Sequence, residues 1–102
     1  MGRLFIMKFI LPKSITVLGH KIKIKVVNTN EYAGLWDYSV NTIFISINQS
    51  PDQMEETFWH ELNHCIQWHT ALNQAIPREL LETMAEMNSR ILPGLIRKLY
   101  RR

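Results

Sequence analysis

The chain has 102 residues, enough for one domain with a small buried core. Hydrophobic residues make up 46% and charged residues 21%, an ordinary globular composition that excludes an intrinsically disordered chain. The formal net charge is only +3, and no stretch is long and apolar enough for a membrane-spanning helix. We therefore expect a single domain over residues 1–102 that has no membrane partner.

The first half of the chain has the pattern of a small β-sheet. Lysines at 21, 23 and 25 alternate with apolar residues at 22, 24 and 26, which gives one charged and one buried face. With the apolar residues before it, this pattern predicts a hairpin over 14–27 that turns at Gly19-His20. We expect a loop over 28–34 and a short strand over 35–38. A turn over 39–42 would then lead into a strand over 43–47, with three isoleucines on one face.

A helix start follows this last strand. Ser50 can cap the helix, Pro51 suits its first position, and Gln53 completes a capping box. The helix should run to about Leu72. Its expected apolar face consists of Phe58, Trp59, Leu62, Cys65 and Ile66.

A second helix should follow a short connection over 73–76. Pro77 opens it, and Pro93-Gly94 should stop or kink it after about Leu92, with one or two more turns over 95–100. Because strands precede helices, we predict an α+β fold. An antiparallel or mixed N-terminal sheet of three to four strands would pack on a C-terminal pair of helices.

The first helix carries the sequence His60-Glu61-Leu62-Asn63-His64. Two histidines four residues apart lie one turn apart on the same helix face, so their imidazoles can bind one Zn²⁺. The glutamate between them can take a proton from a metal-bound water. This spacing predicts metal ligands at His60 and His64 and a general base at Glu61.

A catalytic zinc needs a third protein ligand. Glu79, Glu82 and Glu86 line one face of the second helix, which should return antiparallel to the first. An exposed acidic face is the plain alternative. We expect Glu82 to be the ligand and Glu86 to accept a hydrogen bond from a ligand histidine.

Other polar and aromatic side chains are expected to serve the structure. Cys65 should be a small buried hydrophobe, and one cysteine without a disulfide partner indicates a reducing compartment such as the cytoplasm. His69 should be a structural histidine and His20 a turn residue. The three tryptophans should line the core or the cleft. Stabilisation of an oxyanion could come from Tyr38, His69 or Tyr100, among which the sequence does not choose.

The ordered motifs resemble those of the gluzincin metallopeptidases. They are most similar to small phage-encoded and ImmA/IrrE-like proteins. The resemblance rests on the lysine-bearing hairpin, Gly34-Leu35-Trp36-Asp37, the strand over 43–47, Glu56-Thr57-Phe58-Trp59-His60-Glu61-Leu62, Glu82-Thr83-Met84-Ala85 and Ile91-Leu92-Pro93. It implies zinc ligands at His60, His64 and Glu82, with Glu61 as general base. The small-residue and aromatic signature around the third ligand is weak here, which leaves Glu86 as an alternative to Glu82.

The expected function is hydrolysis of a protein or peptide substrate by a zinc peptidase, in the cytoplasm or, for a phage-encoded chain, in that of its host. The alternative is a non-catalytic, zinc-stabilised protein-binding module, which would not need Glu61. A nucleic-acid partner for the basic end (Arg97, Lys98, Arg101 and Arg102) ranks last, because no nucleic-acid recognition motif is present. If the strand over 43–47 lies at the sheet edge, an extended substrate could pair with it.

Overall fold

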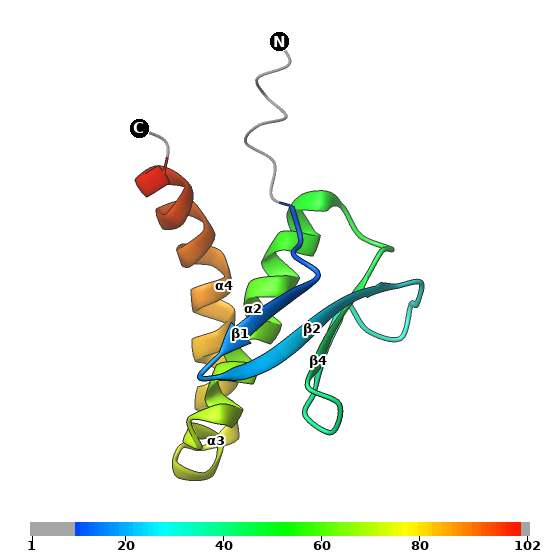
Figure 1. Ribbon diagram of the computed structural model, residues 1–102. Coiled ribbons are helices and arrows are strands. Elements are labelled where there is room, and N and C mark those ends of the chain that lie inside the picture. Colours follow the sequence, from blue (N-terminus) through cyan, green and yellow to red (C-terminus); the bar gives the residue numbers. More distant parts are fainter. Residues whose placement is uncertain (1–9, 101–102) are drawn as a thin grey trace.

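The computed structural model describes residues 10–100, apart from the side chains of residues 96, 97, 99 and 100 (Figure 1). Four strands come first: β1 (Ser14–Val17), β2 (His20–Val27), β3 (Gly34–Asp37) and β4 (Thr42–Ser46). Three helices follow: α2 (Pro51–His69), α3 (Leu72–Ala75) and α4 (Arg78–Tyr100). The predicted α+β order of strands and then helices is confirmed.

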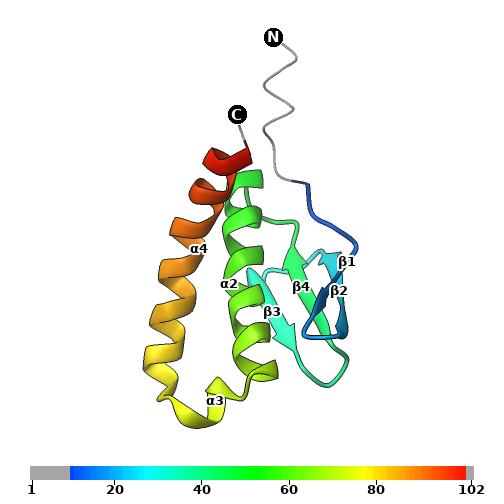
Figure 2. The ribbon, with the colours of Figure 1, turned by 60° about the vertical axis from the view of Figure 1, so that its left-hand side comes forward.

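The strands form one mixed sheet in the order β1-β2-β4-β3. β1 and β2 are antiparallel, β2 and β4 are parallel, and β3 returns antiparallel to β4 as an edge strand. The condition that the strand over 43–47 lies at the edge is therefore not met, because β4 is an interior strand. β3 is the edge strand beside α2 (Figure 2).

Helix α2 lies between the sheet and α4, which runs antiparallel to α2 after the α3 turn (Figure 2). The core forms where α2 covers the sheet. Its buried members come from alternate positions of β2 and β4 and from one side of α2: Ile22, Ile24, Ile43, Ile45, Phe58 and Cys65. The burial expected for Cys65 is confirmed, and it raises the pKa of this thiol to about 11.

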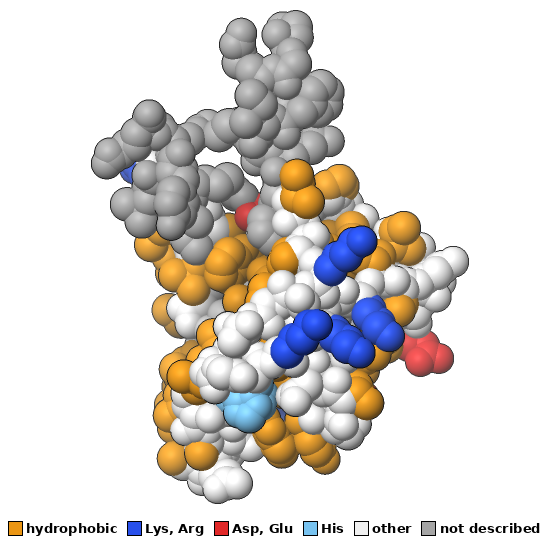
Figure 3. Space-filling view, in the orientation of Figure 1, with side chains coloured by type: hydrophobic (Ala, Val, Ile, Leu, Met, Phe, Trp, Pro, Cys, Tyr) orange, Lys and Arg blue, Asp and Glu red, His pale blue; other side chains and the backbone are white. Residues whose placement is uncertain are grey.

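The opposite face of the sheet is basic. Lys21, Lys23 and Lys25 alternate with the buried isoleucines of β2 and are exposed, as the sequence pattern predicts. The pattern is wrong at Val26, which is 47% exposed. Blue side chains, which are lysines in this part of the chain, gather on this face (Figure 3). Lys98 in the basic end is exposed, whereas Arg101 and Arg102 lie outside the described residues.

Several predicted boundaries in the sheet are wrong by about one residue. The hairpin turns at Leu18-Gly19, not Gly19-His20, because these two residues take the positive φ angles, 49° and 83°, of a two-residue hairpin turn. His20 is the first residue of β2. Ile47 lies past the end of β4 and is 55% exposed, so only two of the three isoleucines enter the core.

The helices also differ in part from the prediction. The capping box of Ser50 and Gln53 is present, but α2 ends at His69, three residues early, because Ala71 takes a left-handed conformation (φ 62°) and starts α3. Ile66 is 39% exposed, so it is not part of the buried face. α4 continues through Pro93, which is buried and whose ring removes one backbone donor without ending the helix. Within residues 10–100, no helix is both long and apolar enough to cross a bilayer.

Candidate metal centre

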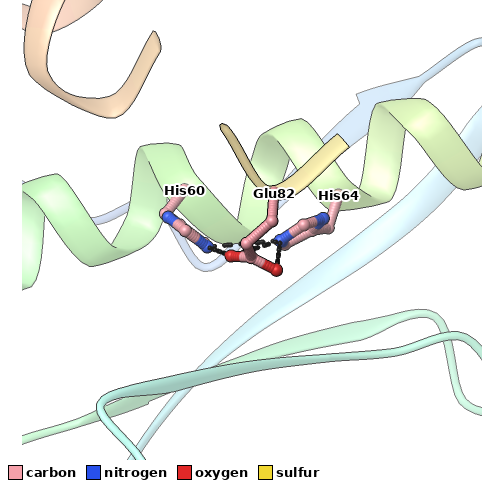
Figure 4. A group of neighbouring side chains, drawn as sticks. All are labelled: His60, His64 and Glu82. Atoms are coloured by element: carbon pink, nitrogen blue, oxygen red, sulfur yellow. Dashed lines mark hydrogen bonds and ion pairs between the residues drawn. The ribbon is translucent and has the colours of Figure 1, made fainter. Parts of the chain in front are cut away.

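Three side chains from two helices meet at one point. α2 presents His60 and His64 one turn apart, and the return of α4 brings Glu82 against them (Figure 4). The two Nε2 atoms are 3.2 Å apart. A carboxylate oxygen of Glu82 lies 2.7 Å from the Nε2 of His60 and 3.4 Å from that of His64. Among the described residues, this is the group of three whose donor atoms, all within 4.8 Å of one another, could hold a metal ion.

The donor set fits a tetrahedral zinc. Zinc bonds of about 2.0–2.1 Å at tetrahedral angles place neighbouring ligand atoms roughly 3.3–3.5 Å apart. The separation of 3.2 Å between the histidines and that of 3.4 Å from His64 to Glu82 fall close to this range. The contact of 2.7 Å from His60 to Glu82 is a hydrogen bond length, so this carboxylate oxygen would move outward by a few tenths of an ångström.

The outer nitrogen of each histidine has its own acceptor. His60 Nδ1 lies 3.0 Å from Oε1 of Glu86, and His64 Nδ1 lies 2.9 Å from Oε1 of Gln67. A ring that donates its Nδ1 proton exposes a lone pair at Nε2. Both lone pairs then face each other and the Glu82 carboxylate, an arrangement of three acceptors that a cation or a shared proton stabilises.

Glu82 and Glu86 occupy different positions around the histidines. Glu82 lies on the Nε2 side, as the sequence prediction for a ligand requires. Glu86 lies on the Nδ1 side of His60 and is also held by Arg90 at 2.9 Å, which suits the predicted hydrogen-bond acceptor. Glu79 is exposed and outside the group. Partial burial works to raise the pKa of Glu82, but the charges and hydrogen bonds of His64 and His60 outweigh it and lower this pKa.

Gln67 was missed by the sequence argument. It is 4% exposed, and its Nε2 donates to the backbone oxygen of Leu81 at 3.1 Å while its Oε1 faces His64. The side chain therefore ties the orientation of His64 to the backbone of α4. Its position three residues after His64, on the same helix face, was the available signal.

Glu61 lies beside the group, within reach of both histidines. Burial raises the pKa of its carboxyl, against the lowering effects of His60, His64 and a backbone hydrogen bond from Trp36. β3 passes so close that a Cβ at Gly34 would meet Thr57 Cγ2 and would lie 2.9 Å from Glu61 Cγ. Glycine at this position allows the edge strand to reach the carboxylate.

Two hollows flank His60 and Glu61. The larger, about 350 Å³, also contacts His64 and Glu82 and extends towards α3 and the first turn of α4. The smaller, about 260 Å³, lies between β3 and α4 on the side of Thr57 and Glu86. A chain crossing the site can therefore place side chains on both sides of Glu61.

The remaining sequence predictions concern residues outside the metal group. His69 stacks on His20 with ring centroids 4.2 Å apart and contacts Asn41, as expected of a structural histidine. Tyr38 stacks on Trp68, which lines the larger hollow. The side chain of Tyr100 lies outside the described residues. For the two candidates with described side chains, Tyr38 and His69, no contact indicates an oxyanion position.

No protein-family model, curated protein or solved structure matches this chain. The resemblance to gluzincins therefore stays a prediction.

Proposed function

We propose that the protein is a zinc-dependent peptidase with ligands His60, His64 and Glu82 and general base Glu61. The observation that carries the proposal is the convergence of two imidazole nitrogens and one carboxylate, with a second, half-buried carboxylate alongside. A structural zinc site has no use for that second carboxylate, whereas hydrolysis needs a proton acceptor at this place.

When bound, Zn²⁺ supplies a Lewis acid that polarises a carbonyl and lowers the pKa of water to about 7. The residues of the chain do the rest. Glu61 takes a proton from the attacking water and returns it to the leaving amine. Its raised pKa suits this exchange, because a carboxylate that is too acidic is a poor proton acceptor. Glu86 and Gln67 hold the two ligand histidines in the tautomer that leaves Nε2 free.

The position of β3 at the sheet edge favours a peptide as the substrate. The backbone carbonyl of Ala33 accepts a hydrogen bond from the N–H of Ser46. Because hydrogen-bonded and non-hydrogen-bonded pairs alternate along an antiparallel ladder, the backbone N–H and C=O groups of Gly34 and Trp36 point away from β4. Trp36 uses its outward N–H for Glu61. The other outward groups of these residues can pair with an extended chain, which would then run along the cleft past Glu61.

The test uses Glu61→Gln, which keeps the size and hydrogen-bonding reach of the side chain but cannot accept the proton. We expect unchanged zinc content by elemental mass spectrometry and a loss of cleavage of about 10²–10⁴-fold, measured on a proteome-derived peptide library. Glu31→Gln is the matched control, because Glu31 is exposed and lies outside the metal group, so both readings should stay unchanged.

Two results contradict the proposal. If Glu61→Gln cleaves the library as fast as the wild-type protein, Glu61 is not the base. If the wild-type protein binds zinc but cleaves no peptide, the site is that of a zinc-stabilised binding module.

A further inference from the structure

The larger hollow beside the metal group is lined by one arginine and by no lysine. This arginine is Arg78, at the first position of α4. Arg78 lies four residues, or one helical turn, before Glu82, so both side chains project from the same side of α4. Glu82 is engaged by His60 and His64 instead. Among the described residues, no ion pair involves Arg78.

Helix stability does not account for this arginine. A cation in the first turn of a helix opposes the helix dipole and therefore destabilises the helix slightly. A pair with the cation N-terminal to the anion is also the weaker of the two orientations on a helix. The guanidinium is therefore available to a ligand in the hollow.

The other walls of this hollow suit the stem of a side chain. Trp36, Trp68 and Leu81 are apolar, and the stacking of Tyr38 on Trp68, with ring centroids 4.2 Å apart, fixes the Trp68 wall. The volume of about 350 Å³ is at the lower end of the range of about 300–1,000 Å³ for small-ligand sites. It can take a single residue of an extended chain.

The smaller hollow is more acidic than the larger one. Glu61 lines both hollows, and the smaller one adds Glu56 and Glu86 with no lysine or arginine. The larger one adds Arg78 and Glu82, and Glu82 is already engaged by the two histidines. A carboxylate on a substrate would be repelled in the smaller hollow and attracted by Arg78. A peptide that crosses the cleft would therefore meet an arginine at one end and only acidic charged side chains at the other.

We infer that the larger hollow is a subsite for a carboxylate of the peptide substrate, which Arg78 binds through its planar guanidinium. This rests on the proposed peptidase function and adds the substrate class. The carboxylate has two sources: an Asp or Glu side chain near the scissile bond, or the free C-terminus of a short peptide.

A binding measurement on a variant without the proposed general base tests this inference independently of catalysis. The protein is the full-length Glu61→Gln variant loaded with zinc, and the method is isothermal titration calorimetry. The ligands are ten-residue peptides of one sequence in which a single Glu is moved position by position, each with its Gln counterpart, and each with a free or an amidated C-terminus. Arg78 is exposed, so we expect at least one carboxylate to strengthen binding by about fivefold, which corresponds to about 1 kcal/mol for an exposed ion pair.

Substitutions of Arg78 show whether this residue causes the preference for a carboxylate. Arg78→Ala should abolish the preference for the carboxylate at unchanged zinc content, whereas Lys25→Ala, which removes the same charge from the outer sheet face, should retain it. Arg78→Glu should reverse the preference in favour of a peptide with Lys at the same position. Dependence on the internal Glu assigns a side-chain carboxylate, and dependence on the free C-terminus assigns the chain end.

The inference is overturned if acidic, amide and amidated peptides bind equally or do not bind, or if Arg78→Ala and Lys25→Ala have equal effects. These outcomes differ from failure of the peptidase proposal. A protein that shows an Arg78-dependent carboxylate preference but never cleaves the preferred peptide retains the subsite and loses the enzyme.

Discussion

At the scale of single residues, the orientation of the metal ligands depends on side chains that are not ligands. His64 is held by Gln67, which is itself fixed to the backbone of Leu81, and His60 is held by Glu86. Glu61 is held by the backbone of Trp36, which reaches it only because Gly34 has no side chain. Substitutions at Gln67 and Gly34, which take no part in the chemistry, should therefore affect the site.

Gln67→Leu should weaken zinc binding. Loss of an acceptor for a ligand histidine commonly costs about 10–100-fold in metal affinity. The measurement is competition with a chromophoric chelator at pH 7.5. Gln67→Glu keeps the acceptor for the Nδ1 proton and should retain most of the affinity. Gln74→Leu, the same change at an exposed position of α3, is the control. Equal affinities in all four proteins would show that Gln67 does not orient His64.

Gly34→Ala should destabilise the protein, because the new Cβ would lie 2.9 Å from Glu61 Cγ and contact Thr57 as well. Overpacking of this kind costs about 1–3 kcal/mol in the free energy of unfolding, measured by urea denaturation. It should also lower the rate of cleavage by displacing Glu61. Gly94→Ala is the matched control: its Cβ would meet nothing within 4 Å, and alanine in a helix should stabilise by about 0.5–1 kcal/mol. The same sign for both variants would contradict the packing argument.

At the scale of elements, the end of α2 is attached to the sheet by His69. Its ring stacks on His20 of β2, contacts Trp36 of β3 at a centroid distance of 5.8 Å, and lies 3.2 Å from Oδ1 of Asn41 in the turn before β4. This attachment fixes the lower end of the helix that carries both ligand histidines. The His69 imidazole at the centre of these contacts is also titratable.

The stability provided by His69 should depend on pH. Burial, and then the charge of His20, lowers the pKa of His69 below its usual value of 6.5. The unfolded chain therefore takes up the proton more readily than the folded one. The contribution is present above about pH 6.5 and is lost as the pH falls below it. The free energy of unfolding from pH 7.5 to 5.0 should fall more steeply for the wild-type protein than for His69→Phe, which keeps a ring for stacking. The zinc-site histidines are common to both proteins, so their titration cancels. Parallel profiles would rule out the shift.

At the scale of the whole molecule, the protein is a three-layer stack of sheet, α2 and α4 in which the outer helix does not cover the sheet (Figure 2). Polar bridges hold α4 in place, among them the pair of Asn88 and Asn63 at 2.8 Å and the pair of Gln67 and Leu81. A metal bound by His60, His64 and Glu82 would join the middle of α2 to the second turn of α4. It should therefore stabilise the entire domain.

Removal of zinc should lower the melting temperature. A ligand that binds only the folded state at about 100 times its Kd stabilises it by about 2.7 kcal/mol. In a domain of this size, each ~1 kcal/mol shifts Tm by about 4–8 °C. Differential scanning calorimetry with and without a chelator measures the shift. His64→Ala should melt at the lower temperature in both conditions, and His20→Ala should still respond to zinc. A chelator that leaves the wild-type Tm unchanged would show that zinc is absent or does not stabilise the fold.

The sequence by itself determined the features that depend on local spacing. Alternation of lysine and isoleucine defined β2 and its buried face, and Ser50 with Gln53 defined the start of α2. The four-residue spacing placed His60 and His64 on one side of that helix. Such signals lie within one element, so the chain expresses them without reference to distant residues.

The tertiary structure alone decided which elements meet. The parallel pairing of β2 with β4 makes β3 the edge strand, a long-range arrangement that no local pattern encodes. The left-handed Ala71 and the short α3 set the register of α4 against α2, and this register places Glu82 at the Nε2 side and Glu86 at the Nδ1 side. The sequence offered three glutamates on one helix face, and their roles differ because the packing of two helices brings only one of them to the point where both imidazoles converge.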